Sequence, residues 1–163
     1  MGIKLRPTSI TDIDFVFLSE QENENKQFVE PWTKEQHIKS LDDQDIRHLL
    51  IESTEEQRLL GYIILAGITI PGKSIEFKRI VVNEKGKGYG REAIRLIKEL
   101  VFEEYNAHRL WLDVKENNYR AQNLYKSEGF VFEGKLRECI KTDKGFESLI
   151  IMSILESEYR NKH

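Results

Sequence analysis

The stretch Ile80-Val-Val-Asn-Glu-Lys-Gly-Lys-Gly-Tyr-Gly-Arg-Glu-Ala93 decides the fold, because an apolar strand runs into a glycine-rich turn and a long amphipathic helix leaves it. Glycines allow successive backbone N–H groups to point into one concavity, and a helix N-terminus adds partial positive charge. Three glycines and three cations fall within this turn: Gly86, Gly88, Gly90, Lys85, Lys87 and Arg91. Such crowding favours a phosphate-binding site over a plain tight turn between strand and helix.

Two common phosphate-binding loops do not fit the turn. A P-loop needs four residues between its first glycine and a Gly-Lys-Ser/Thr, and no Ser or Thr stands here to hold magnesium. The dinucleotide pattern Gly-x-Gly-x-x-Gly is also missed, because the spacing is Gly-x-Gly-x-Gly and no repeated βαβ unit follows. The turn therefore predicts a phosphate ligand of another class.

The rest of the chain alternates strand and helix patterns. Strands are predicted over residues 3–6, 48–52, 59–70, 75–82, 110–114, 130–141 and 146–155. Helices are predicted from Thr8 or Thr11 to about 18, over 34–41, over 88–105, and from Asn118 to 128. Thr33 and Gln36 have the spacing of a capping box before the second helix, and the tail from about 156 is polar. This order predicts one mixed α/β domain over residues 1–163 with its sheet central.

The predicted strand 75–82 changes phase in the middle. Ile75 and Phe77 set one apolar phase, and Ile80 and Val82 set the opposite one. A slip of one residue inside a strand is typical of a β-bulge. A fully buried apolar strand end is the alternative explanation of the same pattern.

Composition and charge narrow the class of protein. The 163 residues are 39% hydrophobic and 33% charged with mixed sign, which excludes a disordered chain with one dominant charge. The net charge of −3 argues against a nucleic-acid partner. Residues 1–60 carry a balance of −6 and residues 61–163 a balance of +3, so the first part suits a cationic ligand and the second an anionic one. An unevenly charged surface without a ligand explains this split equally well.

Other features of the composition bear on location. No apolar run approaches the ~18 residues that span a bilayer, so no membrane association is expected. The first residues also lack the apolar run of a secretory signal. The single cysteine, Cys139, cannot form an internal disulfide, which fits a reducing compartment. We therefore expect a cytoplasmic protein.

Two motifs together resemble the GNAT superfamily of N-acetyltransferases. The turn Lys85-Gly86-Lys87-Gly88-Tyr89-Gly90 resembles the acyl-CoA signature Gln/Arg-x-x-Gly-x-Gly/Ala, with Lys85 in place of the Gln or Arg. Trp111-Leu-Asp-Val114, followed by Asn118-x-x-Ala121-x-x-x-Tyr125-x-x-x-Gly129-Phe130, is similar to the second signature of the family. Leu5-Arg6-Pro7 and the region of Trp32 resemble the branch that acetylates ribosomal-protein N-termini. The resemblance covers the whole chain.

The resemblance implies a fold and a cosubstrate. The fold is a mixed, mostly antiparallel central sheet of about six or seven strands, with a bulged, splayed middle strand and about four flanking helices. The cosubstrate is acetyl-CoA, with its pantetheine arm on backbone groups of Ile80, Val81 and Val82. The remaining implied cofactor contacts are Lys85, Gly86, Lys87, Gly88, Tyr89, Gly90, Arg91 and Asn118. For Asn118, a plain helix cap is the alternative role.

The resemblance also implies catalytic residues. Acetyl transfer needs a base for the amine and an acid for the departing thiolate, and no protein nucleophile. Tyr125 matches the tyrosine that donates a proton to the CoA thiolate, although periodicity alone would make it a core aromatic. Asp113 matches the position of a catalytic glutamate in the ribosomal-protein branch, and Glu76 on the bulged strand is the second candidate base. A solvated or salt-bridged carboxylate is the alternative for both. Cys139 is expected to be structural.

The sequence thus predicts direct transfer of an acetyl group from acetyl-CoA to a primary amine in a ternary complex, without a metal. The acceptor is a small molecule or a peptide, and Glu20, Glu22, Glu24 and Glu30 form an acidic stretch that would attract a cationic one. Polyamines, aminoglycosides, amino acids and protein N-termini all stay open. The alternative function is a non-catalytic acyl-CoA-binding or regulatory module, which would lose the proton donor that Tyr125 supplies. A homodimer is one option for assembly.

Overall fold

The structure is a computed structural model that describes residues 2–22 and 31–161. Its strands are β1 (Ile3–Pro7), β2 (Ile46–Ser53), β3 (Leu59–Ala66), β4 (Ser74–Val82), β5 (Arg109–Lys115), β6 (Val131–Thr142) and β7 (Gly145–Leu155). Its α-helices are α1 (Ile13–Gln21), α3 (Lys34–Leu41), α4 (Tyr89–Glu99), α5 (Tyr119–Ser127) and α6 (Glu156–Asn161). A 3-10 turn, Ile10–Asp12, precedes α1, and a π-helical turn, Leu100–Glu104, follows α4.

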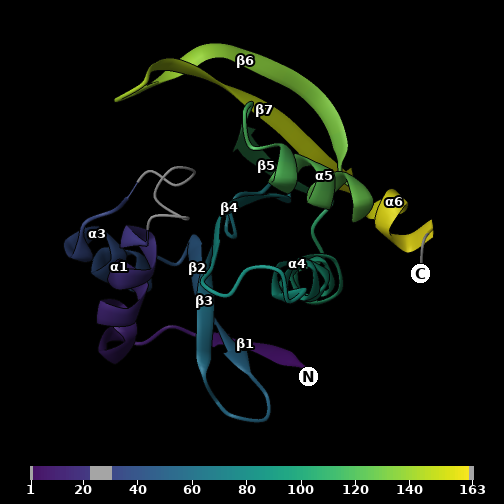
Figure 1. The fold of residues 1–163 in the computed structure, drawn as a ribbon. Helices are drawn as coiled ribbons and strands as arrows, with labels where there is room; N and C mark the ends of the chain where they lie inside the picture. The colour runs from purple at the N-terminus through teal and green to yellow at the C-terminus, as the bar shows by residue number, and fades with distance from the viewer. Residues whose placement is uncertain (1, 23–30, 162–163) are drawn as a thin grey trace.

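The seven strands form one sheet in the order β1-β2-β3-β4-β5-β7-β6. Every neighbouring pair is antiparallel except β4 and β5, which are parallel. Figure 1 shows α1 and α3 on one side of β2–β4 and α4 on the other, with the long β6–β7 hairpin arching past the rest of the sheet. The mixed, mostly antiparallel sheet of the sequence-based prediction is confirmed.

The two faces of the sheet bury separate apolar clusters. The larger cluster lies under α4 and α5 and includes Phe77, Ile94, Leu112 and Tyr125. The smaller one lies under α1 and α3 and consists of Val16, Leu50, Tyr62, Ile64 and Val81. Because side chains alternate along a strand, each residue of β4 and β5 points either into the large cluster or to the opposite face of the sheet. This alternation later places the acid and base candidates on opposite faces.

A bulge interrupts β4 where the sequence predicts it. Phe77 pairs with Leu65 and Arg79 pairs with Ile64, so Lys78 is the extra residue on β4. The slip lets Ile75 and Phe77 before it, and Ile80 and Val82 after it, all contact the same large cluster. The predicted bulge is therefore confirmed.

The pairing of β4 with β5 is short. Only Ser74, Ile75 and Glu76 pair with β5, opposite Arg109, Leu110 and Trp111. Beyond that point the two strands no longer pair, and Phe77–Ile80 and Val82 of β4 and Asp113–Lys115 of β5 line a cleft. The middle of the sheet is thus open on one side, as the predicted splay requires.

Helix ends show where local patterns succeed and fail. Thr33 Oγ1 accepts a hydrogen bond from Gln36 N at 3.1 Å, which confirms the predicted capping box of α3. The predicted caps of α1, Thr8 and Thr11, are wrong. Instead a 3-10 turn begins at Ser9, whose backbone N donates to Asp12 Oδ2 at 2.9 Å, and α1 follows it directly.

The polar tail contains a helix that the sequence did not indicate, so five α-helices flank the sheet within the described residues, one more than expected. In α6 one apolar residue provides the anchor: Tyr159 is buried, stacks on Phe102 with ring centroids 5.0 Å apart, and donates its hydroxyl proton to Glu103. One buried aromatic in a charged segment gives no periodic pattern. Within residues 2–22 and 31–161, no helix is both long and apolar enough to cross a membrane.

Candidate acetyl-transfer site

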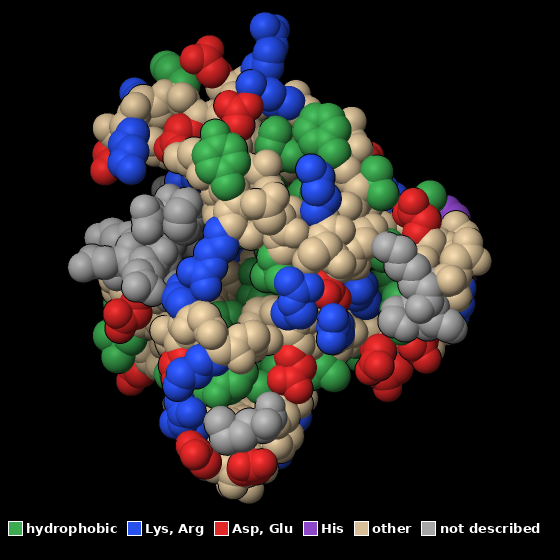
Figure 2. Space-filling view, turned by 45° about the vertical axis from the view of Figure 1, so that its right-hand side comes forward, with side chains coloured by type: hydrophobic (Ala, Val, Ile, Leu, Met, Phe, Trp, Pro, Cys, Tyr) green, Lys and Arg blue, Asp and Glu red, His purple; other side chains and the backbone are tan. Residues whose placement is uncertain are grey.

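A cleft of about 1350 Å³ opens where β4 and β5 separate. Its walls are the second half of β4, the glycine-rich turn, the start of α4, the end of β5 and α5. Predicted site residues that line it are Glu76, Ile80, Val82, Lys85, Gly86, Gly88, Tyr89, Gly90, Arg91, Asp113, Asn118 and Tyr125. Figure 2 shows Lys and Arg side chains gathered around a hollow on this molecule's surface. The fold thus brings nearly all the predicted residues to one cleft.

Two predicted cofactor residues are not among the lining residues. Val81 points its side chain into the small cluster on the α1/α3 face, so only its backbone is available to a ligand. Lys87 is exposed, and its Nζ lies 3.1 Å from Glu84 Oε1. For both residues a role in binding acetyl-CoA stays a prediction.

The glycine-rich turn has the geometry of an anion site. Gly86 and Gly88 have φ of +77° and +80°, a left-handed conformation that side chains rarely adopt. A Cβ built on either residue would meet no atom within 4 Å, so the space beside the turn is open. Gly88 is the N-cap of α4 and has no side chain to accept from the first N–H groups of the helix. Those N–H groups are suited to bind the oxygens of a phosphate.

A buried carboxylate fixes the cation that follows the turn. Arg91 NH1 donates to Glu128 Oε2 at 2.6 Å and to Ser127 Oγ at 2.9 Å. Arg95 and Lys98 bind the same carboxylate, and although burial opposes its ionisation, the three cations lower the pKa of Glu128. Glu128 therefore ties α4 to α5 and orients Arg91 along the edge of the cleft.

Tyr125 lies on the α4/α5 face of the cleft. Asn118 caps α5, its Oδ1 accepting from Ala121 N at 3.2 Å, which confirms the predicted cap. The Tyr125 ring packs edge-on against Phe77 and Phe130, with centroids 6.3 and 5.6 Å apart. Burial, and then the charge of Asp113, raise the pKa of its hydroxyl. The phenol thus keeps its proton at neutral pH.

The two candidate bases lie on the opposite face. Glu76 pairs with Trp111 across the β4–β5 ladder, and Asp113 follows two residues later on the same side of β5. Partial enclosure by the cleft raises the pKa of both carboxyl groups; for Glu76 the nearby Asp113 adds to the increase, while Lys78 opposes it for both. The fold therefore brings both carboxylates together and separates them from Tyr125 by the gap between the strands.

The comparison with known proteins agrees with this geometry. The family model described as the Acetyltransferase (GNAT) family matches residues 17–130. The chain belongs to this family. Acetyl-CoA is its acetyl donor, and the acetyl group passes to a primary amine.

Individual GNAT relatives cover most of the chain. A spermidine N(1)-acetyltransferase of Vibrio cholerae is 32% identical over 79% of this chain and 75% of its own length. A Bacillus subtilis protein, provisionally named a ribosomal protein bS18-alanine N-acetyltransferase, is 32% identical over 90% of this chain and 92% of its own. The crystal structure of the V. cholerae spermidine N-acetyltransferase in complex with CoA and spermine superposes with a TM-score of 0.89 at 27% identity, covering 98% of this chain and 99% of that one.

Several residues of this GNAT cleft had not been singled out from the sequence. They include Trp32, Arg79, Arg120 and Lys141. Arg120 lies two residues after the predicted cap Asn118, in the first turn of α5. Trp32, Arg79 and Lys141 come from three distant segments, and only the tertiary fold brings them together.

The predicted acidic stretch gives a mixed result. The Glu20 carboxylate is fully buried and bound by Arg79 and His37, so the expectation that it presents free negative charge to a ligand is wrong. Glu22 is exposed, and Glu24 and Glu30 lie outside the described residues. Within the described ranges, no three His, Cys, Asp or Glu side chains group closely enough to hold a metal ion.

Gly88→Val tests the glycine-rich turn. A branched side chain in the open space beside the turn should prevent backbone N–H groups from reaching phosphate oxygens. We expect the dissociation constant for CoA, measured by calorimetry, to rise about tenfold or more, since a hydrogen bond to a charged group contributes ~1.5–3 kcal/mol. Gly145→Val is the matched control, because Gly145 also has a positive φ and open space but lies in the β6–β7 turn. Equal CoA affinity of both folded variants would contradict the assignment.

Proposed function

We propose that this chain acetylates a polyamine by direct transfer in a ternary complex with acetyl-CoA. The observation that carries the proposal is the gap between β4 and β5, which has two carboxylates on one face and a protonated phenol on the other. An acetyl group held in the gap would be open to an amine from the carboxylate face. The V. cholerae spermidine acetyltransferase, similar to this chain in both sequence and structure, supports a polyamine as that amine.

The cleft residues divide the binding of acetyl-CoA between them. The N–H groups at the turn and at the start of α4 hold the pyrophosphate, with Lys85 and Arg120 supplying further positive charge. The freed backbone of β4 after the bulge offers hydrogen bonds to the amides of the pantetheine arm, as an unpaired strand edge does. Acetyl-CoA supplies the activated acetyl thioester. The three glycines of the turn, Lys85 and Arg120, and Ile80 and Val82 of β4 all line the cleft.

The proton transfers follow from the two faces. Glu76 or Asp113 takes a proton from the bound ammonium, directly or through water, and frees the nitrogen lone pair. The nitrogen forms a bond to the acetyl carbonyl carbon as the bond from that carbon to sulfur breaks, and it loses a second proton to solvent to give the neutral amide. Tyr125 gives its hydroxyl proton to the departing thiolate and recovers one from solvent. The raised pKa of each carboxyl brings it closer to the neutral range in which a general base is most effective.

The acceptor proposal is tested by a panel of amines at fixed acetyl-CoA, with release of the CoA thiol as the readout. The panel holds spermidine, spermine, propylamine and a short peptide with an N-terminal alanine. We expect kcat/KM to be highest for the polyamines, by at least about tenfold over the others, which corresponds to ~1.4 kcal/mol of transition-state binding. A preference of the same size for the alanine peptide would overturn the polyamine proposal.

The location of the protein in the cytoplasm and its assembly into a homodimer stay predictions.

Tyr125→Phe tests the acid. The substitution keeps the packed ring and removes only the proton donor, so we expect kcat to fall by roughly 10²–10⁴-fold, the usual contribution of a general acid. The affinity for CoA should change little. Tyr105→Phe removes a phenol from the end of the α4 segment, outside the cleft, and should leave kcat unchanged. Wild-type turnover in Tyr125→Phe, with the chemical step limiting the rate, would remove Tyr125 from the mechanism.

A further inference from the structure

A buried charge cluster lies beside the cleft on the α1/α3 face. At its centre is Glu20 of α1, whose side chain is entirely inaccessible to solvent. Its Oε1 accepts a hydrogen bond from His37 Nε2 of α3, and its Oε2 accepts from Arg79 of β4. The same Oε2 also accepts from the backbone N of Trp32 at 3.3 Å. One carboxylate thus joins α1, α3 and the strand that carries the bulge.

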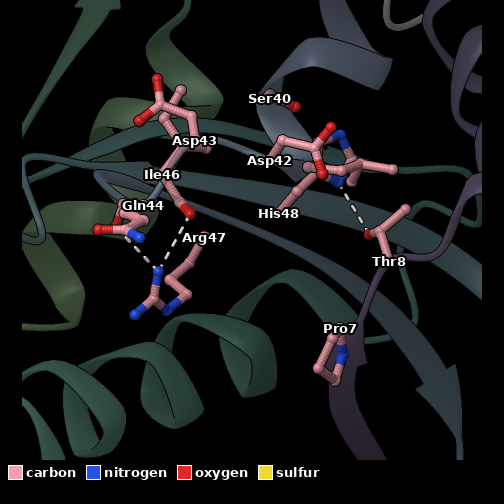
Figure 3. Close-up of a pocket in the computed structure, with 10 residues that line it drawn as sticks. Pro7, Thr8, Ser40, Asp42, Asp43, Gln44, Ile46, Arg47 and His48 are labelled. Carbon is pink, nitrogen blue, oxygen red and sulfur yellow. Dashed lines mark hydrogen bonds between the residues drawn. The ribbon is translucent and has the colours of Figure 1, made fainter.

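A chain of hydrogen bonds holds the histidine in place. His37 Nδ1 lies 3.1 Å from His48 Nε2, and His48 Nδ1 lies 2.8 Å from Thr8 Oγ1. Figure 3 shows the Thr8–His48 bond at the edge of a small pocket of about 260 Å³ between the end of β1 and the start of β2. Burial, and then the charge of His37, lower the pKa of His48 to about 4, so His48 is neutral at neutral pH. The chain therefore orients the His37 ring toward Glu20, while His48 itself stays uncharged.

Arg79 connects this cluster to the cleft. The residue follows the bulge directly, and it lines the cleft together with Trp32. Its guanidinium carbon lies 5.1 Å from the centre of the Trp32 ring. Despite the cost of burial, His37 and Arg79 lower the pKa of Glu20, so its carboxylate is ionised and neutralises the arginine. The positive charge of Arg79 is therefore balanced from behind, on the side away from the cleft.

That balance matters for a cationic acceptor. The carboxylate face of the cleft holds Glu76 and Asp113, which attract an ammonium, and Lys78 and Arg79, which repel it. These four charges sum to zero. The carboxylate of Glu20, which contacts Arg79 and His37, adds a negative charge behind Arg79, and this weakens the repulsion of an ammonium. Removing one partner of a buried ion pair leaves the other as an uncompensated charge.

We propose that Glu20 is a positioning residue for the acceptor, which neutralises Arg79 and holds it against Trp32 so that a cationic amine can occupy the carboxylate face. The proposal rests on the proposed polyamine function in one respect, the positive charge of the acceptor. It assigns a function to a largely buried cluster that the proton transfers at Glu76, Asp113 and Tyr125 do not use.

Removing the negative charge of Glu20 and removing the positive charge of Arg79 should have opposite effects, which tests this proposal. Glu20→Gln removes the buried carboxylate from Arg79, and the KM for spermidine should rise about tenfold, the equivalent of ~1.4 kcal/mol. Arg79→Gln leaves the negative charge and should lower that KM. The KM for acetyl-CoA should stay within about twofold in Glu20→Gln. The double variant Glu20→Gln/Arg79→Gln should return the spermidine KM toward the wild-type value, since it removes both charges.

The dependence of KM on the charge of the amine separates the proposed role of Glu20 from a purely structural one. The ratio of KM in Glu20→Gln to KM in wild type should increase from propylamine to spermidine to spermine, and added salt should reduce it. Glu52→Gln is the matched control. Its buried carboxylate on β2 pairs with Arg6 at 2.9 Å and Lys4 at 3.3 Å of β1, outside the cleft, so the amine KM should stay unchanged.

The outcomes are distinguishable. An equal loss for all amines and for acetyl-CoA, or a double variant worse than Glu20→Gln, would overturn the positioning role. If Glu20→Gln fails to fold, the sign of the KM change in Arg79→Gln decides, and a higher spermidine KM there would also overturn it. A wild-type enzyme that prefers the alanine peptide would overturn the polyamine proposal instead, and peptides of increasing positive charge would then test Glu20.

Discussion

The short parallel pairing of β4 with β5 is the constraint on which the rest of the structure depends. Three residue pairs hold the two strands together, and beyond Glu76 and Trp111 they separate. The bulge at Lys78 rotates the following residues, so that Ile80 and Val82 keep their place in the core while the strand bends away. A continuous sheet would satisfy every backbone group and leave no cleft. The interruption creates a cleft with unpaired backbone along one wall.

The two faces of that gap have different chemistry because side chains alternate. Phe77 and Leu112 point into the core under α4 and α5, where Tyr125 is buried among aromatic rings. Glu76 and Asp113, their neighbours along the strands, point to the face of α1 and α3. A proton acceptor and a proton donor therefore lie on opposite sides of one opening, which suits a reaction that removes a proton from the nucleophile and adds one to the leaving group.

Much of this arrangement was predictable because it is encoded locally. The capping box at Thr33, the cap at Asn118, the glycine-rich turn and the phase slip between Phe77 and Ile80 are all patterns within a few residues. The buried charge cluster around Glu20 could not be predicted in this way. His37 and Arg79 lie 17 and 59 residues after Glu20 in the sequence. A glutamate in a polar segment also gives no sign that it will be buried.

The same limit explains the other differences. Arg91 was expected at the pyrophosphate, and its orientation by Glu128 depends on how α4 meets α5. The α6 helix depends on one contact between Tyr159 and Phe102. The position of β7 between β5 and β6 also follows from long-range pairing, since β7 comes last in the chain. Local pattern thus predicts the elements and the signature residues, while ion pairs between elements require the fold.

The central claim is that the amine loses its proton on the carboxylate face of the gap. The most direct test is the pH dependence of kcat at saturating acetyl-CoA and amine, for wild type, Glu76→Gln and Asp113→Asn. Because burial raises the pKa of both carboxyl groups, kcat should be retained above that raised pKa and lost as the pH falls through it. One of the two variants should lose roughly 10²–10⁴-fold in kcat together with this acid limb. Wild-type kcat and an unchanged acid limb in both variants would contradict the account.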